Sequence, residues 1–176
     1  MNTLLILGVN PSLIYKALIG KNWMQESNVD LSANIEEYLV NCGWYTGRKI
    51  DSEHIIEAWK ADKYKIFNSA IVFVQSFNGL NIAHEAYRGK EKDFSYFNSI
   101  KATEGIDPAW IFEEYSLKAG SDLLPIGLGY SEHLTYFIDP SFKFYGGYDD
   151  YFCKIGDSVN SFFNNIFYEK TLFNCK

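Results

Sequence analysis

Apolar residues recur every three or four positions along the first half of the chain, which is the spacing of a helix with one buried face. This pattern predicts helices over residues 32–42 and 66–77. Between them, Asp51 can cap a further helix that carries Ile55 and Trp59 on its apolar side. The first half of the chain is therefore expected to be mainly helical.

After Asn78-Gly79 the apolar period shortens toward two, which is the spacing of a strand. Asp107-Pro108 then indicates a helix start, and we expect that helix to end near Gly120 with Trp110 and Ile111 facing inward. Short apolar or alternating runs separated by turn residues predict strands over residues 80–84, 94–100, 123–128, 134–138 and 142–145.

Gly146-Gly147 is expected to end the last clear strand, and Asp157 to cap a closing helix whose wide apolar face includes Phe162 and Phe163. Helices that pack on a mainly antiparallel sheet give an α+β fold. A length of 176 residues suits a single domain. We therefore predict one α+β domain in which helices flank the sheet.

The apolar run at residues 4–9 is short, no Lys or Arg precedes it, and Asn10-Pro11 interrupts it. These features disfavour a signal peptide. We expect residues 1–30 to form an N-terminal extension packed on a domain that covers residues 31–176.

The segment GWYTGR at residues 43–48 follows the first predicted helix. Gly43 suits the left-handed position that closes a helix, and Trp44 can then fold back over the apolar face. Gly47 provides a turn, and the guanidinium of Arg48 can bond free helix-end carbonyls or a carboxylate. We expect a structural role for this motif, and the alternative is a ligand or partner contact centred on Arg48.

The order and spacing of these and later residues resemble the SUKH superfamily of bacterial immunity proteins, specifically its third subgroup. One departure is Asn78, where members of the family usually have a second glycine; Asn tolerates a turn there. The resemblance runs from about Ile35 to Tyr168 and rests on Gly43, Trp44, Gly47, Arg48, Asp51, Phe77, Gly79, Leu80, Leu124, Pro125, Ile126, Gly127, Ile138, Asp139, Phe144, Tyr145 and Gly146.

This resemblance implies a SUKH-like α+β domain and a non-enzymatic protein that binds and neutralises a cognate toxin of a polymorphic or contact-dependent system. The expected toxin is a nuclease or a nucleic-acid deaminase. An alternative function is that of an intracellular regulatory scaffold, as in other members of the superfamily. A small hydrolase or ligand-binding enzyme is disfavoured, because no nucleophile, base and orienting group can be assembled from the sequence.

The net charge of −6 arises in one part of the chain. Residues 103–150 carry 9 acidic and 2 basic side chains, whereas acidic and basic residues nearly balance elsewhere. A surface of one sign attracts a partner of the opposite sign, so we expect a basic protein partner and no direct binding of nucleic acid. Three widely spaced cysteines and no long apolar segment favour a reduced, cytoplasmic protein that does not bind a membrane.

The sequence lacks the spacing of a zinc site, a phosphate-binding loop or an EF-hand calcium loop. The three histidines each have an acidic neighbour in sequence, but His54 lies on a predicted helix, and the other two lie on predicted strands, where adjacent residues point to opposite faces. We expect no catalytic, cofactor or metal site, and we interpret the aspartates near Gly146-Gly147 as a solvated acidic rim.

Tyrosines alternate with carboxylates along that rim, a composition that suits a contact anchored by rings and steered by charge. The alternative is a soluble exposed loop with two half-buried tyrosines. The expected partner-binding residues are Tyr130, Glu132, Tyr148, Asp149, Asp150 and Tyr151, which surround Gly146-Gly147, expected to be flexible.

Overall fold

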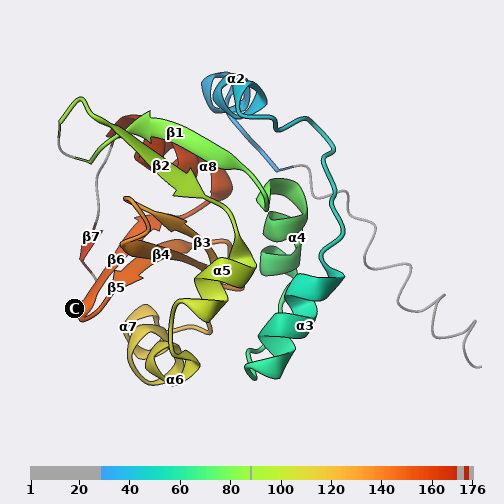
Figure 1. The fold of residues 1–176 in the computed structure, drawn as a ribbon, viewed down its shortest axis with the longest axis vertical. Coiled ribbons are helices and arrows are strands. Elements are labelled where there is room, and N and C mark those ends of the chain that lie inside the picture. Colours follow the sequence, from blue (N-terminus) through green and yellow to red (C-terminus); the bar gives the residue numbers. More distant parts are fainter. Residues whose placement is uncertain (1–28, 88, 170–172, 175–176) are drawn as a thin grey trace, which may run out of the picture.

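One antiparallel sheet organises the computed structural model, which describes residues 29–87, 89–169 and 173–174. Strands that follow one another in the chain are neighbours in the sheet, so the described connections are simple hairpins or short helical excursions (Figure 1). In sheet order the strands are β1 (Asn81–Glu85), β2 (Lys92–Tyr96), β3 (Leu124–Gly129), β4 (Leu134–Ile138), β5 (Phe144–Tyr148), β6 (Tyr151–Gly156) and β7 (Phe173–Asn174).

Helices flank this sheet, which confirms the predicted α+β class. Among the described residues, three helices precede the sheet: α2 (Ala33–Asn41), α3 (Glu53–Ala61) and α4 (Asn68–Phe77). The others are α5 (Ser99–Glu104), the continuous run of α6 (Pro108–Trp110), π-helical η1 (Ile111–Tyr115) and α7 (Ser116–Ala119), and the closing pair α8 (Val159–Asn164) and η2 (Asn165–Glu169). The predicted packing of residues 1–28 lies outside the described residues.

Phenylalanine rings fill the core between the sheet and helices α4 and α8. Phe162 of α8 stacks on Phe144 of β5 with ring centroids 4.4 Å apart, and Phe73 of α4 lies 5.3 Å from Phe144. On the opposite face of the sheet, Tyr115 of η1 stacks on Phe152 of β6 at 4.8 Å. Because helices cover both faces, β3 and β4 are buried along their full length.

Two strand predictions are wrong at their ends. The predicted strand over residues 94–100 stops at Tyr96, because the Asn98 side chain accepts a hydrogen bond from the Lys101 amide (3.0 Å) and starts α5. The predicted stop at Gly146-Gly147 is also wrong, since both glycines lie inside β5 and pair with β6.

These two glycines are buried within a paired strand and do not form the exposed loop that was expected. A Cβ atom on Gly147 would lie 2.5 Å from the Tyr115 ring, and one on Gly146 would lie 2.7 Å from the Leu134 side chain. At Gly147 the sheet therefore approaches Tyr115 of η1 at a distance that only glycine permits.

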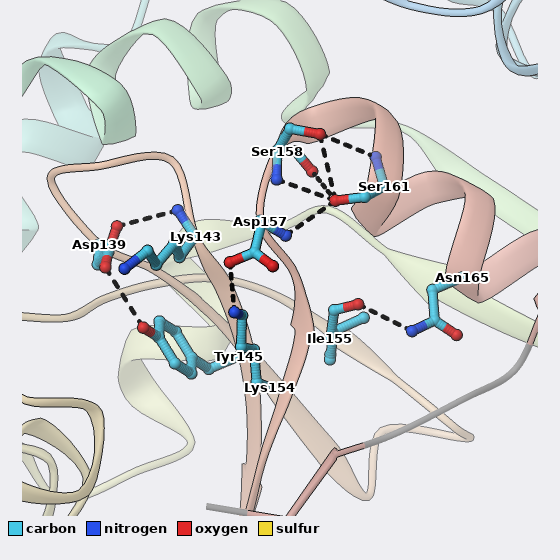
Figure 2. Close-up of polar contacts among 9 residues, drawn as sticks. All are labelled: Asp139, Lys143, Tyr145, Lys154, Ile155, Asp157, Ser158, Ser161 and Asn165. Carbon is cyan, nitrogen blue, oxygen red and sulfur yellow. Dashed lines mark hydrogen bonds and ion pairs between the residues drawn. The ribbon is translucent and has the colours of Figure 1, made fainter.

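Polar side chains hold the chain in place at the end of the sheet where β4 leads into β5, as Figure 2 shows. Asp139 is 2% exposed, and its Oδ1 accepts hydrogen bonds from the backbone amides of Ser141 (2.7 Å) and Lys143 (2.9 Å) while Oδ2 accepts one from the Tyr145 hydroxyl (3.3 Å). The predicted cap of α8 is off by one residue, because Ser158 and Ser161 form the capping box there.

Candidate partner-binding surface

Hairpin turns gather at one end of the sheet because neighbouring antiparallel strands alternate in direction. The turns between β1 and β2, β3 and β4, and β5 and β6 share this end, which we call the hairpin end (residues 86–87, 89–91, 130–133 and 148–151). Ring contacts join them: Tyr87 lies 6.1 Å from Tyr130, and His133 lies 6.5 Å from Tyr148. The six residues expected to bind a partner are thus in or beside two adjacent turns.

The turn between β3 and β4 has an unusual backbone. Tyr130, Ser131 and Glu132 all have positive φ, at 51°, 57° and 67°. Each non-glycine residue in this region costs about 1–2 kcal/mol, so the surroundings must hold the turn. Oδ1 of the buried Asp93 accepts hydrogen bonds from the Ser131 amide (2.9 Å) and hydroxyl (3.2 Å), and Lys101 of α5 forms an ion pair with Glu132.

The tyrosines of the hairpin end differ in exposure. Tyr148 is 52% exposed, whereas Tyr130 and Tyr151 are half-buried, and burial raises the pKa of both hydroxyls. The Tyr130 ring lies edge-on to His84 at 6.2 Å. Of the three tyrosines expected to bind a partner, Tyr130 and Tyr151 are thus half-buried, as in the alternative of a soluble exposed loop, and Tyr148 has an exposed ring.

The turn between β5 and β6 presents both aspartates to solvent, and Asp149 has a φ of 46°. Side chains of the helix over residues 108–119 bond to the backbone of this turn. The Asp149 carbonyl accepts hydrogen bonds from the Tyr115 hydroxyl (2.8 Å) and the Trp110 indole (3.2 Å), and the Asp150 carbonyl accepts one from the Lys118 ammonium (3.2 Å). These bonds fix the backbone and leave both carboxylates outward.

The GWYTGR segment makes structural contacts. Gly43 closes α2 with a φ of 92°, and the Trp44 ring is 7% exposed and lies parallel to Phe77 at 6.1 Å. Arg48 donates to the carbonyls of Ser76 and Asn78, both at 2.8 Å, at the end of α4. The motif therefore joins the ends of two helices, and burial lowers the Arg48 pKa.

A comparison with known families can be set beside this geometry. The sequence profile of the SUKH-3 immunity protein family matches residues 31–169, which include α2 through η2. The chain belongs to the SUKH-3 immunity protein family. No significant match was found among curated proteins or among solved structures.

The remaining motif residues of this SUKH-3 protein lie in the framework. Gly47 and Gly79 have positive φ, at 79° and 88°, and Pro125 precedes a bulge in β3. A Cβ on Gly127 would lie 2.7 Å from the Tyr96 carbonyl, so this glycine lets β2 approach β3. Asn78 has a φ of −60° and needs no left-handed tolerance; its side chain accepts a hydrogen bond from the Ser99 amide (2.8 Å).

The helix over residues 108–119 donates hydrogen bonds to the turn at Asp149 and Asp150, which we call the acidic turn. Sequence reasoning missed the exposed apolar residues of this helix. Trp110, expected to face inward, is 42% exposed, and Leu117 is 76% exposed. Ile111, also expected to face inward, is fully buried, and so is Tyr115 one turn later, which fits the same inward face. Only Trp110 departs from the expected inward face.

Within the described part of the chain, no three His, Cys, Asp or Glu side chains are placed to hold a metal ion. Asp139 and Asp149 do not form one acidic rim, because Asp139 precedes β5 and Asp149 follows it, at opposite ends of that strand.

A shallow cleft lies beside α3 and is lined by residues between Lys49 and Lys60, far in sequence from the hairpin end. No described helix has both the length and the apolar character to cross a bilayer.

Proposed function

We propose that this SUKH-3 protein is a cytoplasmic, non-enzymatic immunity protein that binds a cognate toxin through the hairpin end. Family membership supports the immunity role. The observation that carries the choice of surface is the turn at Asp149 and Asp150, whose carbonyls are anchored by three side chains while its carboxylates face solvent. Such a turn is pre-organised, so a partner that binds it loses little ordering entropy.

The toxin that fits this surface has a basic active face, as a nuclease or a nucleic-acid deaminase does. An enzyme that binds nucleic acid needs positive charge around its cleft, and the carboxylates of Asp149 and Asp150 can occupy that region. Inhibition is then competitive with nucleic acid. Outlying charges set mainly the association rate, whereas desolvated rings and hydrogen-bonded carboxylates set the residence time.

The residues of the hairpin end have separate roles in this proposal. Tyr148, Asp149 and Asp150 contact the toxin directly. Glu132 contributes less, because Lys101 already neutralises it. Tyr130 and Tyr151 are half-buried and support the turns from beneath.

The test is co-expression with the toxin domain encoded beside this gene, followed by co-purification and measurement of growth. We expect wild-type protein to form a complex and restore growth. The double variant Asp149→Lys/Asp150→Lys should slow association by about tenfold or more at low salt, with the difference shrinking as salt screens the charges. Its matched control is Glu37→Lys/Glu57→Lys, which makes the same charge change on exposed positions of α2 and α3.

Two results would contradict the proposal. Failure of the wild-type protein to bind or protect against the neighbouring toxin removes the immunity role for that pair. Equal association rates for the two double variants at low salt remove the acidic turn from the interface and leave the immunity role standing.

A further inference from the structure

A strongly exposed apolar side chain lies on the helix that supports the acidic turn. Leu117 is 76% exposed on a helix that already buries Ile111 and Tyr115 against the sheet. Trp110 is 42% exposed on the same helix. A helix that has satisfied its core contacts and still exposes large apolar side chains offers apolar contact area to a partner.

The helix places these exposed side chains beside the acidic turn. Trp110 and Lys118 both donate hydrogen bonds to carbonyls of that turn, so the side of the helix between them faces it. Tyr115 donates to the same turn, Glu114 and Leu117 directly precede Tyr115 and Lys118, and both of these preceding side chains are exposed. We call Trp110, Glu114, Leu117, Asp149 and Asp150 the helix–turn surface.

Charge defines what this surface can accept. Glu114, Asp149 and Asp150 are exposed carboxylates, and they outnumber the one ammonium nearby, that of Lys118, which donates a hydrogen bond to the Asp150 carbonyl and keeps its charge. Tyr148 does not belong to this surface, because successive strand residues alternate and Gly147 is the residue that faces Tyr115. The helix–turn surface therefore combines two apolar groups with an acidic border.

Building on the proposed function, we infer that the helix–turn surface is the anchor site for one segment of the toxin, which carries Arg or Lys beside an apolar side chain. The apolar side chain covers Leu117, and the cation lies over the Trp110 ring while it pairs with the turn carboxylates. This contact controls how long the complex lasts, whereas the charge of the turn controls how fast it forms.

The experiment measures dissociation of the complex between the full chain and the neighbouring toxin domain. Leu117→Ser and Trp110→Ala should each increase the dissociation rate about tenfold or more, with a smaller change in association rate. The matched control is Val40→Ser, which removes a 50% exposed apolar side chain from α2 and should leave dissociation unchanged. The denaturation midpoint of Leu117→Ser should equal that of the parent, which shows that the effect is not unfolding.

Amide hydrogen exchange provides a readout that needs no substitution. Residues 108–119 and 149–150 should exchange more slowly in the complex than in the free protein. Unchanged dissociation for both variants and unchanged exchange would overturn this inference while immunity stands. A wild-type protein that fails to bind the toxin would overturn the proposed function as well. Sedimentation provides a third outcome. If the wild-type protein is a dimer and Leu117→Ser is a monomer, the helix–turn surface binds a second copy of the chain, and the inference is overturned.

Discussion

Gly147→Ala tests whether the close approach of β5 and η1 supports the acidic turn. The added methyl would lie 2.5 Å from Cε2 and 2.7 Å from Cζ of Tyr115. Carbon atoms prefer separations of about 3.5–4.0 Å, so the overlap is about 1 Å and Tyr115 must move. Tyr115 is fully buried and cannot move toward solvent without shifting the helix.

The expected loss of stability has two sources. Overpacking a filled core costs about 1–3 kcal/mol, and a shifted Tyr115 would lose its hydrogen bond to the Asp149 carbonyl, which adds about 1 kcal/mol. The lower entropy of the unfolded alanine chain offsets about 0.4–1 kcal/mol of this. We expect a net destabilisation of about 1–3 kcal/mol.

Urea unfolding followed by tryptophan fluorescence measures this change, and Tyr115→Phe is the control. The control removes the hydroxyl without adding volume and should cost only about 1 kcal/mol. Both substitutions remove the same hydrogen bond, so the double variant Gly147→Ala/Tyr115→Phe loses it only once. Its loss of stability should therefore be smaller than the sum of the two single losses by about 1 kcal/mol. A Gly147→Ala protein as stable as the parent would show that the sheet and the helix are not in close contact.

Further predictions concern the framework. Trp44→Ala should cost about 3–5 kcal/mol of stability, because it removes a buried ring. Trp44→Phe should cost less than about 1.5 kcal/mol, because the indole N–H has no hydrogen-bond partner among the described residues. Equal unfolding midpoints for the parent and Trp44→Ala would show that the ring is not buried. Asp139→Ala should cost about 2–4 kcal/mol, because it leaves two turn amides without their acceptor, and Asp139→Asn should cost less because it keeps Oδ1; similar losses for both variants would contradict this. Burial raises the pKa of Tyr115 and Tyr136 above the ordinary 10.0, so the folded state keeps protons that the unfolded state releases, and stability present at pH 8–9 should fall as the pH rises above about 10. Urea midpoints that stay constant from pH 9 to pH 11 would refute that assignment.

The helices of the first half could be predicted because their apolar spacing alone separates a buried face from an exposed one. Ile35 and Leu39 of α2 and Ile55 and Trp59 of α3 are all fully buried. The last three residues of β5, and β6 after them, were not predicted, because the glycine pair was expected to end the last clear strand. A pair of glycines in sequence indicates a turn, and only the position of the Tyr115 ring explains why these two belong inside a strand.

The candidate surface was predictable in part. The acidic turn is visible in composition, because Tyr148, Asp149 and Asp150 follow an apolar run. Its apolar neighbours were not predicted, since Trp110 was expected to face inward with Ile111 and no expectation was made for Leu117. Contacts between residues about forty positions apart, such as Trp110 with Asp149, depend on tertiary packing and leave no local signal.

Backbone strain supports the choice of the hairpin end as the working surface. Among the described residues, four of the six non-glycine positions with positive φ are Tyr130, Ser131, Glu132 and Asp149, and all four lie in its turns. Relaxed hairpin turns would use glycine or asparagine there at lower cost. Dedicated contacts hold these turns in place: Asp93 and Lys101 for the first three, and Tyr115 with Trp110 for Asp149. The buried Asp93 carboxylate accepts hydrogen bonds from the exposed turn at Ser131 and so fixes the shape of the surface there. A surface of fixed shape is what recognition of a rigid partner requires.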